Sequence, residues 1–167
     1  MEFSRRISQL LHEDHAETIS LIEMLEDMIA KARKNAPDIN DAAVRKTLEK
    51  SAAMIEHELN HHFSFEEDEL FTRLEEAGDA SIGEHLREEH AAILPLGENV
   101  ATLAAQALNQ CFSQESWTEF RNLAGELIER MLSHIQKEEM SLLPMLEDLL
   151  EPEMDMELAE AFEQSQQ

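Results

Sequence analysis

The chain carries one short pattern twice, and both copies have the spacing of an α-helix. The pattern is His-x3-Glu-Glu-x2-Leu-x3-Leu, and its second copy, at His134, begins 72 residues after the first, at His62. A shorter Leu-x3-His pattern precedes each copy, at residues 11–15 and 86–90. Because residues four apart share one face of an α-helix, each pattern defines one helical face. The duplication predicts two similar helical hairpins that pack around a pseudo-two-fold axis.

Apolar residues recur at intervals of three and four along four long segments, which predict helices at about 4–35, 41–76, 81–108 and 116–151. Ser-x-x-Glu capping boxes are expected to open the third helix at Ser81 and the fourth at Ser116. Pro95 is expected to kink the third helix. Long helices with short connections pack as antiparallel neighbours. The sequence therefore predicts an all-α, up-down-up-down four-helix bundle over 1–150 and an acidic tail or short helix over 151–167.

The charge of the chain limits its partners. Its 37 acidic and 13 basic residues give a net charge of −24, which argues against binding to nucleic acid or to an anionic membrane surface. Cys111 is the only cysteine, so neither an internal disulfide nor a cluster of thiolate ligands is expected. No signal peptide or membrane span is recognisable, and a cytoplasmic location is expected.

Six polar residues interrupt the apolar stripes of the predicted helices. A carboxylate in such a stripe would be buried, which is costly unless the group is paired or bound to a cation. No Lys or Arg shares these stripes. A histidine and a glutamate four residues apart can reach one site. The pattern therefore predicts one or two first-row metal ions, with iron favoured and manganese or zinc also compatible. The predicted metal ligands are His15, His62, Glu66, His90, His134 and Glu138.

The remaining histidines are weaker candidates for metal ligands. His12, His57, His61 and His85 are interpreted as surface groups or as outer contacts of the site. Glu67 and Glu139 directly follow the two candidate glutamates. They are expected to face solvent or to accept a hydrogen bond from a ligand histidine rather than to bind metal themselves.

These motifs resemble the hemerythrin-like, or HHE cation-binding, domain family, and the resemblance covers residues 5–150. It implies two non-haem iron ions bridged by Glu66 and Glu138 and by an oxo or hydroxo group. His15, His62, His90 and His134 would be the terminal ligands. An open position would accept O₂, NO, peroxide or azide.

The resemblance is incomplete on the third helix, where oxygen-carrying hemerythrins have two histidines four apart. Here the positions four before and four after His90 are Leu86 and Leu94. An iron with fewer nitrogen ligands would bind O₂ less reversibly. We therefore expect binding of O₂, NO or a related oxidant for sensing, iron handling or stress response rather than oxygen storage.

An alternative function is a di-iron oxidase or a reductase for NO or peroxide. The chain has no flavin, haem or iron–sulfur motif, so a partner protein would have to supply electrons. A phosphotransfer bundle is disfavoured because its histidine would be exposed, and a ferritin-type bundle would show Glu-x2-His pairs. The sequence leaves open whether the site is catalytic.

Overall fold

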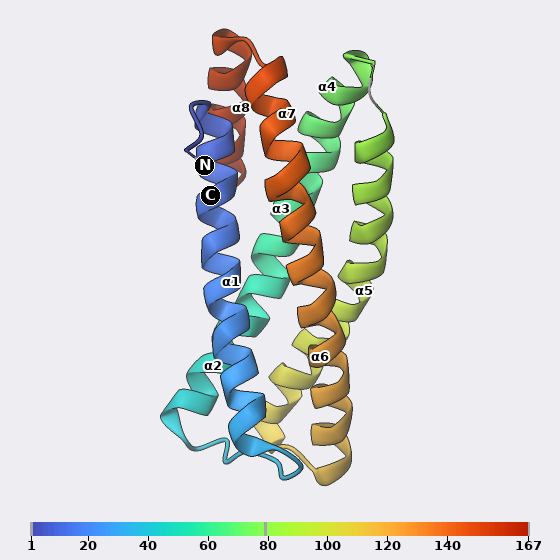
Figure 1. The fold of residues 1–167 in the computed structure, drawn as a ribbon. Helices are drawn as coiled ribbons and strands as arrows, with labels where there is room; N and C mark the ends of the chain where they lie inside the picture. The colour runs from blue at the N-terminus through green and yellow to red at the C-terminus, as the bar shows by residue number, and fades with distance from the viewer. Residues whose placement is uncertain (1, 79, 167) are drawn as a thin grey trace.

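The predicted helical segments form long antiparallel helices in the computed structural model of the chain (Figure 1). The structure describes residues 2–78 and 80–166, and the side chain of Glu58 is not described. Three residues of the predicted segments therefore lie outside the described part of the chain. They are residue 79, in the predicted break between the hairpins, and residues 1 and 167 at the two ends. The first predicted segment is α1 (Arg6–Ala32), and the third is α5 (Ser81–Gln110). The fourth begins with α6 (Gln114–Lys137) and continues through η3 (Glu138–Leu142) and α7 (Leu143–Leu149).

The second segment is helical throughout but changes its winding. It consists of α2 (Ala42–Ala53), η1 (Met54–Leu59), α3 (Asn60–Phe65), η2 (Glu66–Leu70) and α4 (Phe71–Glu76), where η marks a π-helical stretch. Such stretches are rare and concentrate at functional sites. Both η2 and η3 begin at a candidate metal ligand, Glu66 and Glu138 respectively. The duplicated motif thus has a duplicated distortion of the backbone.

The helix starts differ from the predicted capping boxes. The cap of helix α6 lies three residues earlier than expected: the Ser113 side chain accepts a hydrogen bond from the Ser116 amide, and the Ser116 hydroxyl accepts one from the Ser113 amide. Ser116 is therefore the inner partner of the box, not its cap. At α5 the cap position is Ala80, which has no side-chain oxygen to accept a hydrogen bond. Pro95 lies inside α5, which continues through it to Gln110.

Two apolar clusters fill the bundle, one on each side of the candidate metal ligands. One cluster contains Leu59, Phe63, Met131 and Ile135 and extends toward the α1–α2 connection. The other lies at the end of the bundle that contains the N-terminus of α1. All six leucines of the duplicated patterns belong to this second cluster: Leu11, Leu70, Leu74, Leu86, Leu142 and Leu146. The repeat therefore encodes an apolar layer together with the polar layer beside it.

A further helix, α8 (Pro152–Ser165), packs beside α1 (Figure 1). Leu158, Ala159 and Phe162 are buried, so this acidic segment packs more closely than its composition indicates. The Phe162 ring meets the Phe65 ring at 5.1 Å between centroids, in an edge-to-face arrangement. Apolar residues on one face of the segment, which its overall acidity obscures, account for this packing.

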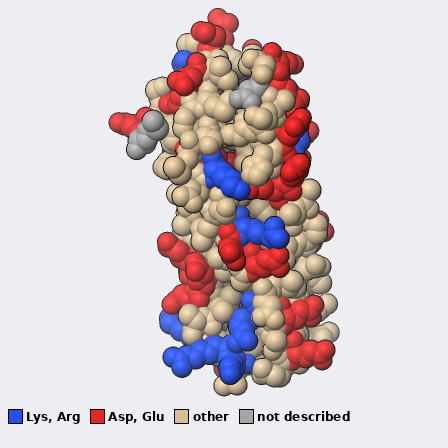
Figure 2. Space-filling model, turned by 45° about the vertical axis from the view of Figure 1, so that its right-hand side comes forward, with Lys and Arg blue, Asp and Glu red and all other residues tan. Residues whose placement is uncertain are grey.

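Acidic side chains are spread along the face of the molecule in Figure 2, whereas Lys and Arg form a patch at its lower end and are scattered above it. No helix in the described part of the chain is long and apolar enough to cross a membrane.

Candidate metal centre

The six predicted ligands meet in the interior of the bundle. They form two overlapping groups, and in each group the candidate donor atoms lie within 4.8 Å of one another. Every member is buried, with Glu66 and Glu138 fully inaccessible to solvent. The groups are His15, His62, Glu66 and Glu138, and Glu66, His90, His134 and Glu138. Two buried His/Glu clusters that share both glutamates are consistent with a site for two metal ions.

Each glutamate turns one oxygen toward each histidine pair. Oε1 of Glu66 lies 2.5 Å from Nε2 of His62, and its Oε2 lies 3.1 Å from Nε2 of His90. Oε2 of Glu138 lies 2.8 Å from Nε2 of His15, while its Oε1 contacts Nε2 of His134. This is the geometry of two carboxylates that span a pair of adjacent cation positions.

The donor set fits a cation better than it fits hydrogen bonding alone. Both oxygens of Glu66 and Oε1 of Glu138 are buried and accept no hydrogen bond of acceptable geometry, despite the nearby imidazoles. The Nε2 atoms of His90 and His134 are only 3.1 Å apart. Buried carboxylates without hydrogen bonds are costly, and two facing imidazole nitrogens need a proton or a metal between them. Imidazole and carboxylate ligands suit a first-row metal ion.

A carboxylate also contacts the outer nitrogen of each of the four imidazoles. Because an ionised carboxylate can only accept hydrogen bonds, the imidazole Nδ1 must donate, which leaves Nε2 available to bind a metal. The Nδ1 atom of His62 lies 2.5 Å from Asp14, and that of His134 lies 2.7 Å from Glu89. The sequence prediction missed both acids. Each directly precedes a ligand histidine, in Asp14-His15 and Glu89-His90, and this repeated acid-His pair was the signal available.

The other two acids had been identified as possible hydrogen-bond acceptors. Glu139 accepts from Nδ1 of His15 at 2.7 Å, and Glu67 lies at a longer 3.4 Å from Nδ1 of His90. Glu139 also contacts the exposed His12 at 2.9 Å. The four outer carboxylates therefore follow the same pseudo-two-fold symmetry as the histidines they orient.

The acidic surroundings favour the charged form of the histidines when only protein atoms are considered. Burial lowers the pKa of His15 and of His90, but interactions with the nearby glutamates outweigh it and raise each pKa to about 9. Burial works against ionisation of Glu138, but His134, His15 and His62 hold the pKa of that carboxyl well below its usual value. The buried carboxylates of this layer therefore favour bound cations, whether protons or metal ions.

Aromatic rings and a leucine close the site. Phe63 stacks on His90 with 3.8 Å between centroids and 6° between the ring planes, and its edge faces His134. Phe162 of α8 approaches His62 at 6.2 Å, edge to face. Leu86, one of the two positions where a fifth histidine could stand, is fully buried in the apolar layer. The structure thus places a hydrocarbon side chain at that position.

A small cavity of about 10 Å³ adjoins the first metal group. That volume corresponds to about one water molecule. The polar part of its wall includes His15, His62, His134 and Glu138, and its apolar part includes Leu59, Phe63, Met131 and Ile135. A ligand with more than about one heavy atom would have to displace part of this wall.

The four remaining histidines are exposed and lie outside both groups of described ligands. His12 contacts Glu139, and His85 lies 3.3 Å from Lys137, which itself contacts Glu89. His57 and His61 line a separate surface cavity. The structure therefore places no additional described histidine at the position that a fifth imidazole would occupy.

Fold and site together define a class of protein: an antiparallel helical bundle whose interior holds a duplicated His/Glu cluster suited to two metal ions. The Hemerythrin HHE cation binding domain matches residues 6–146, and the chain belongs to this family. The predicted hemerythrin-like fold is thereby confirmed. A search of curated proteins finds no match to the chain.

Proposed function

We propose that the chain is a non-haem di-iron protein that binds O₂, NO or a related small oxidant in a sensing, iron-handling or stress-response role. The observation that carries this proposal is the placement of one oxygen of Glu66 and one of Glu138 beside each histidine pair. Two imidazoles and two carboxylate oxygens would then hold each ion, and such mixed nitrogen and oxygen donors suit iron.

The ligand set supports an open site. With four protein donors for each ion, coordination positions remain for small exogenous ligands, and a bound iron pair would supply reversible redox chemistry there. The protein's own residues orient the imidazoles, through Asp14, Glu89 and Glu139, and exclude bulk water with Phe63 and Met131. The cavity beside His15 and His62 limits the ligand to a few heavy atoms. These features favour diatomic ligands and azide-sized anions over organic substrates.

The test is metal content together with the visible spectrum of aerobically purified protein, before and after azide. About two irons per chain, with near-ultraviolet oxo-bridge bands that shift on azide, would support the proposal. One zinc per chain, or a colourless protein that gains no absorption when loaded with iron, would overturn it. Mixing the reduced protein with NO or with O₂ would then identify the better ligand.

A further inference from the structure

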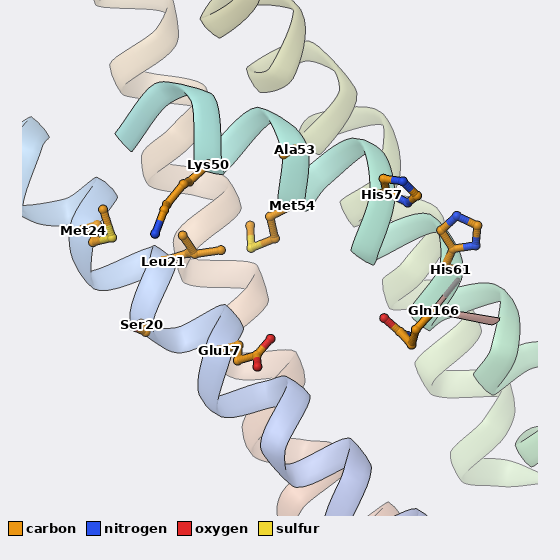
Figure 3. Close-up of a pocket in the computed structure, with 10 residues that line it drawn as sticks. All are labelled: Glu17, Ser20, Leu21, Met24, Lys50, Ala53, Met54, His57, His61 and Gln166. Atoms are coloured by element: carbon orange, nitrogen blue, oxygen red, sulfur yellow. The ribbon is translucent and has the colours of Figure 1, made fainter. Parts of the chain in front are cut away.

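A second group of potential metal ligands lies on the surface of the bundle. A cavity of about 600 Å³ opens between α1 and η1 and reaches the C-terminal end of the described chain (Figure 3). It shares no lining residue with the small cavity beside the metal centre. Its wall includes the exposed His57 and His61. Neither residue has a role in the buried centre.

The two imidazoles are placed as a chelating pair. They are four residues apart, the spacing by which the histidines of an H-E-x-x-H helix hold zinc. Their ring centroids are 5.1 Å apart, and their planes are inclined by 32°. Two imidazoles that bind one tetrahedral ion, each through a nitrogen about 2.0–2.1 Å away, have centroids roughly 5 Å apart. The pair therefore needs little rearrangement to share an ion.

The surroundings of the pair favour a cation. Glu17 of α1 lies across the cavity and offers a carboxylate, while Gln166 lies beside His61 (Figure 3). Lys50 lies at the opposite end of the cavity from the two imidazoles (Figure 3). The net charge of −24 raises the local concentration of cations around the whole molecule. His57 lies in η1, a π-helical stretch like η2 and η3.

We propose that His57 and His61 form a peripheral site for a divalent transition-metal ion, separate from the buried centre. Water molecules complete the coordination of the ion. Two neutral imidazoles favour the later first-row ions, so Cu²⁺ binds most tightly and Ni²⁺ and Zn²⁺ bind less tightly. The site is open to solvent and exchanges its ion without unfolding the bundle.

The experiment titrates Cu²⁺ into the full-length, iron-containing protein and follows the copper by electron paramagnetic resonance. One copper per chain with hyperfine splitting from two nitrogens is expected. His57→Gln or His61→Gln alone should weaken binding at least about tenfold, because each removes the chelate. The double variant should lose little more than either single variant, since one remaining imidazole no longer chelates. A single variant that still binds copper with unchanged affinity would mean two independent surface histidines and would overturn the site.

The matched controls are His12→Gln and His85→Gln, which remove exposed histidines elsewhere and should leave copper affinity unchanged. Loss of the two-nitrogen signal in either control would contradict the assignment. Iron content and the visible spectrum are measured throughout. Copper uptake that releases iron and persists in the double variant would place copper in the buried centre and refute the peripheral site. The outcome does not depend on which small molecule the buried centre binds.

Discussion

At the scale of single residues, the candidate metal centre rests on two glutamates that face each other across the bundle. Glu66 and Glu138 are fully buried, and three of their four oxygens lack a hydrogen bond of acceptable geometry. A bound cation removes that cost, because a buried charge is tolerated when it coordinates a metal. The same residues therefore link the stability of the interior to any cation that binds there.

We expect Glu66→Ala or Glu138→Ala to lose at least one metal ion per chain, because each glutamate has an oxygen beside both histidine pairs. Metal analysis and the visible spectrum measure the effect. Glu129→Ala, at an exposed position on α6, serves as the control and should keep its full metal content. A variant at Glu66 or Glu138 that retains two ions and an unchanged spectrum would refute the bridging roles.

A weaker effect is expected from the acids that orient the histidines. Glu89→Gln removes the charge that accepts from Nδ1 of His134 and that also contacts Lys137. Metal affinity should fall about 10- to 100-fold, the usual consequence of losing such an outer contact. Competition with a chelator of known affinity measures the change, and the exposed Glu88→Gln is the matched control. Equal affinity in the two variants would show that Glu89 has no orienting role.

The sequence was sufficient to predict the location of the six central residues because His and Glu stand out in an apolar stripe. Asp14 and Glu89 were missed for a physical reason. Acidic residues are abundant in this chain, so one beside a ligand histidine carries little information until the helices are placed. Each of these acids orients a histidine of another helix rather than its own neighbour. Only the crossing of the helices reveals that pairing.

At the scale of helices, the periodicity of the apolar residues predicted the elements but not their ends or their winding. Helix α6 begins at Gln114 because the side chains of Ser113 and Ser116 accept hydrogen bonds from each other's amides. The Ser-x-x-Glu pattern at Ser116 predicted the cap at the wrong one of these two serines. The π-helical stretches were not predicted, since their residues fit an α-helical pattern equally well. Two of the three described stretches, η2 and η3, begin at Glu66 and Glu138, the glutamates that the two buried His/Glu groups share.

The start of α1 depends on two helices that are distant in sequence. Its cap residue, Arg5, has no capping side chain of its own, while the amides of Arg6 and Ile7 each donate to Asp155 of α8 at 2.9 Å. Glu147 of α7 accepts from the amide of Arg5 at 2.7 Å. Because the family match ends at residue 146, these contacts come from the part of the chain that follows it.

Asp155→Ala is expected to destabilise the protein by about 2 kcal/mol, because two amides at the start of α1 lose their acceptor in a buried setting. The melting temperature should fall by roughly 4–8 °C for a chain of this size. Thermal unfolding followed by circular dichroism measures the change. Glu157→Ala, at an exposed position of α8, should melt like the unmodified protein. Identical melting of both variants would show that α8 does not cap α1.

At the scale of the whole molecule, a layer of charged and polar groups lies between two apolar clusters, and this arrangement links metal binding to folding. The apolar layers alone would favour the bundle with or without metal. The polar layer is compatible with that bundle only when cations balance its carboxylates. Protons and metal ions compete for the same imidazoles, so pH separates their contributions.

We expect the metal-free protein to lose stability as the pH rises from about 6.5 to above 9. The pKa of His15 and of His90 is raised to about 9 by the surrounding carboxylates, which outweigh the opposing effect of burial. A raised pKa stabilises the fold fully below the unfolded value of 6.5, and the contribution is lost as pH passes the folded value. Each protonated histidine contributes of order 3 kcal/mol to the free energy of unfolding, or roughly 6–12 °C in melting temperature.

In the metal-loaded protein the ions replace these protons, so its melting temperature should stay constant over the same pH range. Thermal unfolding of both forms in matched buffers measures the difference between their melting temperatures, which should increase with pH. Parallel melting curves for the loaded and metal-free forms between pH 6.5 and 9 would show that the buried histidines do not exchange protons for metal.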